Sequence, residues 1–246
     1  MISSNSKLVI KEINPQTLFK GRSYCSVRQI ETMLGKFNAT HETILTYLRI
    51  WKQRKLIFPA GRGWYSIYPN ALALKDDYVS PVVAYMRQRF PELDFRVWST
   101  RQMLSYHHHL PMRYVTFVNV DRYGMRMVYD DLRKTKLAND VACNPRSYDI
   151  PNLSRPTDLI VVRPMTYMDA QEGGGGVHSP EGVLVDYAIE SERLMLTDAE
   201  EYKAVVTNAL RDHRVNVSQI FSRLRYRTRV SEYTKALLSC LPEEKK

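Results

Sequence analysis

Positive charge is concentrated in the first 75 residues of this 246-residue chain. That block holds twelve Lys or Arg and three Asp or Glu, a net charge of +9, whereas the rest of the chain is nearly neutral at +1. Such an asymmetry is typical of a nucleic-acid-binding module joined to a second module. Basic side chains gain affinity for a polyanion because neutralised phosphates release their counterions. The chain is therefore expected to fold as two modules with different tasks.

The composition restricts the class of protein. The chain is 44% hydrophobic and 25% charged, as folded globular proteins are. No stretch approaches ~20 apolar residues, and residues 1–7 lack an apolar signal segment. Cys25, Cys143 and Cys240 are too widely spaced for a zinc ribbon. We expect a cytoplasmic protein without a membrane partner or a cofactor.

The basic block has the pattern of two short helices joined by a turn. Apolar residues recur at helical spacing over residues 26–34, and Ser26 and Gln29 have capping-box spacing. A second helix is expected over residues 40–55, with Thr40 as its N-cap. Its apolar face is formed by Ile44, Leu48 and Trp51.

A hairpin is expected to follow the second helix. Residues 56–58 and 64–68 are β-prone and flank a Gly-rich tip at residues 59–63. Helix, turn, helix and basic-tipped hairpin is the order of a winged helix-turn-helix, whose second helix enters the major groove of DNA. The alternative is a solvated basic face. The residues expected to meet base edges are Asn38, Thr40, His41, Thr43, Thr46 and Tyr47. Those expected to meet phosphates are Arg49, Lys52, Arg54 and Arg62.

The remainder of the chain predicts an α/β domain with a helical C-terminal cluster. The predicted fold is thus mixed, with a winged helix-turn-helix domain at residues 1–75 and an α/β effector domain at residues 76–246. Strands are expected at residues 95–98, 114–120 and 158–163, and helices at residues 79–90, 99–108, 124–134 and 179–188. Helices are also expected from Asp198 onward, with breaks near Arg214 and Arg229.

No motif in the chain indicates catalysis or a metal. His107, His108 and His109 would point in different directions on a helix, so they cannot converge on one ion. Residues 173–176 are four glycines without the order of a phosphate loop. Glu201-Tyr202-Lys203 has the spacing of some nuclease motifs, but it falls where a helix is expected to begin. We therefore assign no catalytic residue and no metal ligand.

A second basic cluster lies near the C-terminus. Arg223, Arg225 and Arg227 alternate around Tyr226. They are predicted to form a surface for a partner, which could be an acidic protein face or a nucleic acid. A solvated helix face is the alternative interpretation of the same residues.

The layout resembles the AbiEi-like antitoxins of bacterial type IV toxin–antitoxin systems over most of the chain. The resemblance rests on residues 51–57, 61–66, 95–100, 114–118, 160–164 and 179–186, the last of which resembles the family's Pro-x-x-x-Leu-Val-Asp helix. Gly182 departs from the family pattern, which has a larger residue there, and the glycines at 173–176 are a further departure. The resemblance implies a DNA-binding autorepressor with a second domain that opposes a nucleotidyltransferase-like toxin.

Three functions follow from these observations. The first is a non-enzymatic antitoxin that represses its own operon by binding duplex DNA at its own promoter, and that counters the toxin or its nucleic-acid substrate. The second is a winged-helix transcription regulator whose C-terminal domain senses a ligand or dimerises. The third is a nucleic-acid-processing enzyme, which requires acidic side chains to converge in the folded second domain. Neither the operator nor the oligomeric state follows from the sequence.

Overall fold

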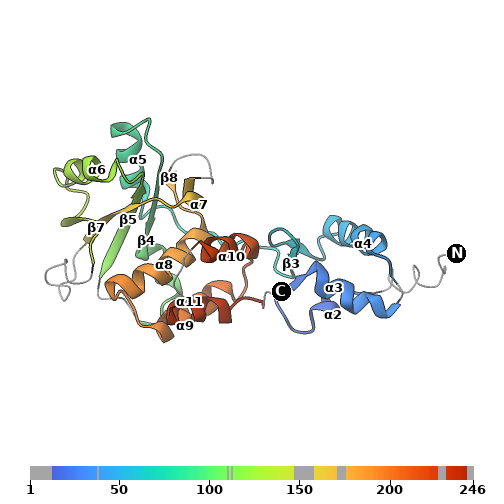
Figure 1. Ribbon diagram of the computed structural model, residues 1–246. Coiled ribbons are helices and arrows are strands. Elements are labelled where there is room, and N and C mark those ends of the chain that lie inside the picture. Colours follow the sequence, from blue (N-terminus) through green and yellow to red (C-terminus); the bar gives the residue numbers. More distant parts are fainter. Residues whose placement is uncertain are drawn as a thin grey trace. The chain divides into compact units, whose positions relative to one another are not determined.

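The chain forms a mixed α/β structure with two sheets, as the sequence predicted (Figure 1). The computed structural model describes residues 13–37, 39–109, 111, 113–146, 158–170, 176–226 and 231–242. Contacts divide the chain into two compact units. The described residues of the first unit lie within 13–72, 209–226 and 238–242, and those of the second lie within 73–208 and 231–237.

The first unit consists of short helices around a small antiparallel sheet. Its elements are α2 (Pro15–Phe19), β1 (Tyr24–Ser26), α3 (Val27–Leu34), the 3-10 turn η1 (Gly35–Phe37), α4 (His41–Gln53), β2 (Phe58–Pro59), β3 (Trp64–Ser66) and α10 (Val217–Arg225). The strand order in the sheet is β1-β3-β2. Apolar side chains from α2, α3 and α4 meet in one core, which includes Phe19, Ile30 and Trp51.

Both predicted helix starts of the first unit are confirmed. The Ser26 hydroxyl accepts from the Gln29 backbone N–H, and the Gln29 side chain accepts from the Ser26 N–H, which completes the capping box. The Thr40 hydroxyl accepts from the Thr43 N–H at the start of α4. Strand β1 was not predicted, because its three residues are too few to show alternation.

Helix α10 belongs to the first unit, whereas the sequence prediction placed it in the second domain. The Val217 backbone N–H donates to the carbonyl of Ala60, and the Phe221 ring lies 6.1 Å from the Trp64 ring. The segment before α10 also joins this unit, because the Leu72 N–H donates to the Arg214 carbonyl. The difference arises because these contacts link residues about 150 positions apart, which no local pattern reveals.

The second unit is built on a five-stranded mixed sheet. Its elements are α5 (Ser80–Arg89), β4 (Phe95–Ser99), the 3-10 helix η2 (Thr100–Tyr106), β5 (Tyr114–Val120), α6 (Met125–Leu132), β6 (Asp140–Cys143), β7 (Asp158–Pro164), α7 (Tyr167–Ala170), β8 (Gly176–Val177), α8 (Pro180–Leu194), most of α9 (Ala199–Leu210) and most of α11 (Glu232–Ser239). The strand order is β6-β7-β5-β4-β8. Only the β4–β5 pairing is antiparallel.

Helices cover both faces of this sheet (Figure 1). On one face, α5 and α6 pack Val83, Met86 and Val128 against Val118 and Val162 of the strands. The other face carries an aromatic column. Trp98 and Phe117 stack with ring centroids 4.2 Å apart, Tyr187 of α8 meets Trp98 edge-on at 6.4 Å, and Tyr202 of α9 meets Tyr187 at 5.6 Å. The sheet is therefore buried on both sides.

A row of buried polar side chains crosses the same face as the aromatic column. Arg96, Asn119 and Arg163 are cross-strand neighbours on β4, β5 and β7, and each is at most 5% exposed. Arg163 donates from Nε and Nη2 to Oε2 of Glu190 on α8, at 3.0 and 2.5 Å. Asn119 donates to Asp186, one helical turn before Glu190. Polar contacts thus fix α8 to the centre of the sheet.

The long strands were predicted correctly, and the edge strands were not. Strands were predicted at residues 114–120 and 158–163, where β5 and β7 lie, because both are long and β-branched. The edge strands β6 and β8 were missed, since neither has a hydrophobic pattern of useful length. The helix expected at residues 99–108 is the 3-10 helix η2. The break near Arg214 is confirmed, and the one near Arg229 lies outside the described residues.

Membrane insertion through a helix has no support in the structure. Within the described ranges of the chain, no helix combines the length and the apolar character that a bilayer crossing needs.

Arg163→Gln is expected to lower the free energy of unfolding by about 3 kcal/mol, because it leaves a buried carboxylate oxygen of Glu190 without its guanidinium. Chemical denaturation would measure this change. Arg126→Gln is the matched control, because Arg126 pairs with Asp130 on the surface of α6, where its side chain is 74% exposed. Equal destabilisation by the two variants would show that the buried Arg163–Glu190 pair contributes no more to stability than the exposed Arg126–Asp130 pair.

Candidate nucleic-acid interface

Helix α4 divides into a buried face and an exposed basic face. Ile44, Leu48 and Trp51 pack into the core of the first unit. Outside this buried stripe the helix carries Arg49 and Lys52, which are both exposed, with Lys52 bordering the stripe one turn after Leu48. This division follows from the spacing of the apolar residues, which recur at the helical period and hold the helix by one side only.

The structure places five of the six predicted base-contacting residues at the N-cap or in the first two turns of α4. His41 and Thr46 are exposed, and so is the N-cap Thr40. Thr43 and Tyr47 are half-buried; the Thr43 hydroxyl hydrogen-bonds to the Thr40 hydroxyl, and the Tyr47 ring lies 5.9 Å from the Trp51 ring. Both therefore have structural roles as well. Asn38 lies outside the described residues.

The N-terminal end of α4 also contacts α3 through a pair of side chains. His41 Nδ1 lies 2.5 Å from Oε1 of Glu31 on α3, and the His41 side chain is 65% exposed. This contact ties the beginning of α4 to α3 across the turn between them. The predicted phosphate-contacting residue Arg54 is exposed just beyond the other end of α4.

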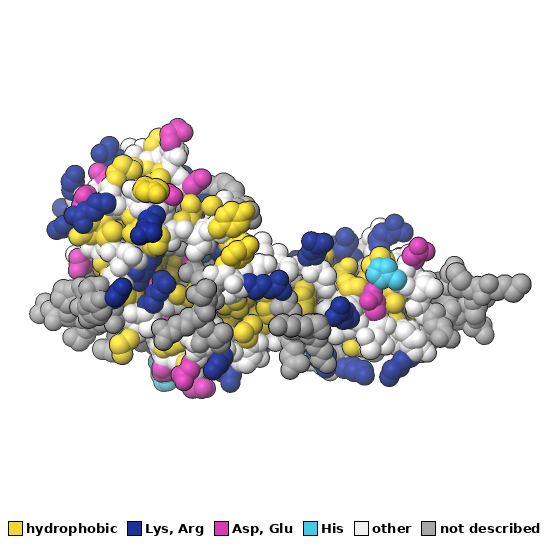
Figure 2. Space-filling model, in the orientation of Figure 1, with side chains coloured by type: hydrophobic (Ala, Val, Ile, Leu, Met, Phe, Trp, Pro, Cys, Tyr) yellow, Lys and Arg dark blue, Asp and Glu magenta, His cyan; other side chains and the backbone are white. Residues whose placement is uncertain are grey.

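Basic side chains outnumber acidic ones on this unit. On the face shown in Figure 2, Lys and Arg are spread over the N-terminal unit, and acidic side chains are few. Helix α4 itself contains one acidic residue, Glu42. The segment 209–226 adds four Arg and one Asp to the unit, which raises its positive charge further. The surface electrostatics therefore favour an anionic partner.

The hairpin tip is held in place by α10. Arg62 donates its backbone N–H to the Ser218 hydroxyl at 2.9 Å, while its side chain is exposed. On the other side, the Gly63 carbonyl accepts from the Val27 N–H at the start of α3. Local sequence predicts a role for Arg62 but not this support, because Ser218 is remote in sequence. The exposed Arg62 side chain thus extends from a backbone that is held on both sides by hydrogen bonds.

The predicted partner surface around Arg223 is wrong for Arg223 itself. Arg223 is 4% exposed, whereas Arg225 is exposed and Arg227 lies outside the described residues. Arg223 follows Ile220 by three residues, so it lies beside the buried face of α10. The prediction placed Arg223 and Arg225 on one surface, but residues two positions apart in an α-helix point to nearly opposite sides.

The second unit separates the three consecutive histidines. His107 is packed inside, with Nε2 3.0 Å from the Tyr187 hydroxyl and Nδ1 3.3 Å from Oε1 of Glu201. Burial lowers the pKa of His107, and the Glu201 carboxylate partly opposes this shift. His108 and His109 are exposed. Glu201 lies in the first turn of α9, so the Glu201-Tyr202-Lys203 sequence is helical, as expected.

Comparison with known protein families identifies the chain's family. Residues 43–241 match a family described as a family of unknown function (DUF6577). The matched range begins inside α4 and includes parts of both units. A comparison with curated proteins found no match.

Gly61→Ala is expected to destabilise the first unit more than Gly63→Ala. Both glycines have positive φ, +104° and +76°, so Ala costs about 1 kcal/mol or more at either position. Only at Gly61 would the new Cβ collide with α10, at 2.3 Å from Asn216 Oδ1 and 2.4 Å from Ser218 Oγ. This crowding adds ~1–3 kcal/mol. Thermal unfolding of both variants checks the difference. Equal losses would contradict the packing of α10 on the tip.

Proposed function

Because the chain belongs to the family of unknown function DUF6577, we propose its function from its own geometry: the first unit is a winged helix-turn-helix that binds duplex DNA. The observation that carries the proposal is that α4 exposes Arg49 and Lys52 while its apolar side is fixed in a core. The order α2, β1, α3, α4, β2, β3 and the sheet order β1-β3-β2 support this fold.

The dimensions and side chains of α4 suit the major groove. An α-helix with its side chains is about 10–12 Å in diameter, which fits a groove about 12 Å wide, and the 13 residues of α4 extend over about 20 Å. His41 and Thr46, near the N-terminus of α4, would meet base edges. Arg49 and Lys52 would meet phosphates, which position the helix without reading sequence. Arg62 would add a phosphate contact from the hairpin tip.

We further propose that the protein is an antitoxin that represses its own operon. The support is the resemblance to AbiEi-like antitoxins together with the division into two units of different charge. Residues 95–100, 114–118, 160–164 and 179–186, which carry part of the resemblance, lie in or next to β4, β5, β7 and α8. They belong to the core of the second unit, so that unit would carry the antitoxin activity. The alternative is a regulator whose second unit senses a ligand or dimerises.

Replacing Arg49 and Lys52 together with Gln is expected to weaken binding of the full chain to duplex DNA. The decrease should be similar on its own promoter and on a scrambled duplex, because phosphate contacts carry no sequence information. The plot of log affinity against log salt should become shallower by about 0.9 for each phosphate that the variant no longer neutralises. Fluorescence anisotropy over a salt series measures both quantities.

Two further variants control this measurement. Thr46→Ala should weaken promoter binding by about 1 kcal/mol and leave scrambled-duplex binding unchanged, if Thr46 meets a base. Arg126→Gln, on the second unit, should leave DNA binding unchanged. Unchanged affinity and salt dependence in the Arg49→Gln, Lys52→Gln variant would reject the proposed interface.

The same double variant separates repression from antitoxin activity. It is expected to lose repression of a promoter fusion while still rescuing growth from a nucleotidyltransferase-like toxin encoded beside it. Growth on co-expression and reporter output would be measured in parallel. Failure of the unchanged chain to rescue growth would leave DNA binding standing and favour the alternative regulator.

A further inference from the structure

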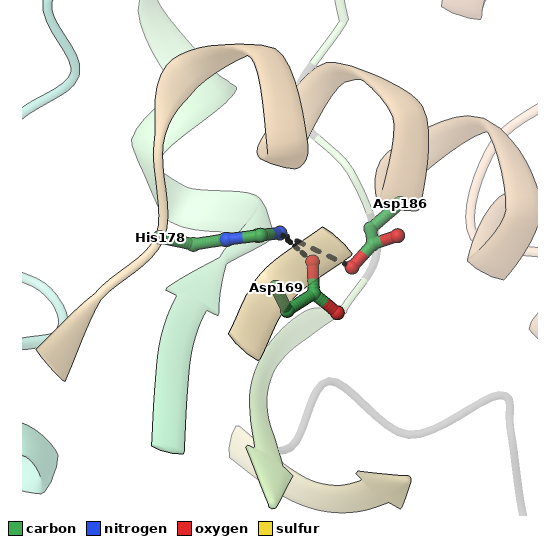
Figure 3. A group of neighbouring side chains, drawn as sticks. All are labelled: Asp169, His178 and Asp186. Carbon is green, nitrogen blue, oxygen red and sulfur yellow. Dashed lines mark ion pairs between the residues drawn. The ribbon is translucent and has the colours of Figure 1, made fainter. Parts of the chain in front are cut away.

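Three side chains with metal-ligating groups meet inside the second unit (Figure 3). They are Asp169 of α7, His178 between β8 and α8, and Asp186 of α8, and the ligand atoms that they offer lie within 4.8 Å of one another. Their side chains are between 0% and 7% exposed. We propose that these three residues bind one divalent metal ion.

The separations are those of ligand atoms around an ion. His178 Nε2 lies 3.3 Å from Oδ2 of Asp186 and 3.7 Å from Oδ1 of Asp169. The second distance exceeds that of a hydrogen bond, and the first is at its upper limit. Two ligands each about 2.1 Å from a tetrahedral Zn²⁺ are about 3.4 Å apart. One imidazole nitrogen thus faces two carboxylate oxygens at coordination spacing.

The charges of the cluster favour a cation at its centre. Two carboxylates and one imidazole nitrogen converge where water is excluded. Carboxylate oxygen and neutral imidazole nitrogen are both ligands for divalent cations. A divalent ion balances both negative charges and uses the lone pair on Nε2 as a ligand.

Neighbouring groups orient the ligands. Thr166 donates to Oδ2 of Asp169 from its backbone N–H at 2.9 Å and from its hydroxyl at 2.6 Å, while Oδ1 faces His178. Asn119 of β5 donates to Oδ2 of Asp186 at 3.2 Å. Metal-ligating carboxylates are commonly held by such second contacts, which fix the direction of the ligand oxygen.

Gly182 provides an independent sign that the position of His178 matters. A Cβ at Gly182 would lie 2.3 Å from both Cε1 and Nε2 of His178. The imidazole therefore packs directly on the backbone of α8, where only glycine leaves room. Glycine is unfavourable within a helix, so α8 gives up some intrinsic stability to accommodate this ring. The same glycine departs from the antitoxin pattern in the sequence.

The expected ion is structural, with Zn²⁺ as the first choice. One imidazole and two carboxylates form a mixed set of three nitrogen and oxygen ligands, which suits Zn²⁺ when a water molecule or a second carboxylate oxygen fills the fourth position. Burial of all three side chains closes the site to large substrates. The ion would tie α7, the start of α8 and, through Asn119, the central strand β5 to one another. Sequence analysis named no metal ligand, because these residues share no recognised spacing.

Zn²⁺ binding by the full, untagged chain tests the proposal. After treatment with a chelator, titration calorimetry should show one ion per chain, and Zn²⁺ at ~100 times its Kd should raise Tm by about 5–10 °C. Asp169→Asn and Asp186→Asn should each abolish this rise while keeping side-chain shape. Thr166→Val should weaken Zn²⁺ affinity by about 10–100-fold.

The control variant carries His108→Gln and His109→Gln, because exposed histidines bind Zn²⁺ weakly on any surface. It should keep the stoichiometry and the rise in Tm. Loss of binding in this control, or its survival in both Asp variants, would overturn the proposal. A third outcome would also overturn the proposal: Zn²⁺ does not raise the Tm of the unchanged chain, and the Asp169→Asn variant is more stable than the unchanged chain. The cluster would then be a buried charge network.

A spectroscopic measurement keeps the test decisive if the Asp variants do not fold. Co²⁺ added to the unchanged chain should give the strong visible absorption of a four-coordinate site, and Zn²⁺ should displace it at one equivalent. A spectrum no different from that of hydrated Co²⁺ would overturn the proposal. None of these measurements involves DNA binding or toxin rescue, so their outcome is separate from that of the proposed function.

Discussion

The second unit depends on the contact between the buried polar row of its sheet and the polar face of α8. Arg163 binds Glu190, and Asn119 binds Asp186, which lies one helical turn earlier. Because both partners on α8 are acidic and buried, neither can be left without its donor at low cost. These bonds fix the register of α8 on the sheet. That register in turn brings Asp186 next to His178 and Tyr187 next to Trp98.

The stability of the first unit has a different basis, because this unit has few residues with which to form a core. It presents one side of α4 to solvent, so its stability relies on the buried side and on the support of remote segments. Helix α10 provides that support by bonding to Ala60 and Arg62 at the hairpin tip. The segment that a linear division assigns to the second domain is thus part of the proposed DNA-binding unit.

The two proposals concern separate properties of the chain. DNA binding rests on exposed cations, which act through long-range electrostatics and require little burial. The metal site rests on buried ligands, whose attraction for the ion is strengthened by the exclusion of water. An ion at Asp169, His178 and Asp186 would stabilise the second unit without taking part in DNA recognition. It would also account for convergent carboxylates without requiring a nuclease, since the cluster is closed to a polymer.

The sequence by itself determined the charge asymmetry, the helix caps at Ser26 and Thr40 and the long central strands, because each depends on residues close together in the chain. The proposal of a nucleic-acid partner also starts from the sequence, since charge is additive along a segment. Tertiary structure alone decided that α10 supports the hairpin, that Arg223 is buried and that Asp169, His178 and Asp186 converge. These features depend on which distant segments pack together. Packing is set by the shapes of whole elements, and local periodicity does not contain that information.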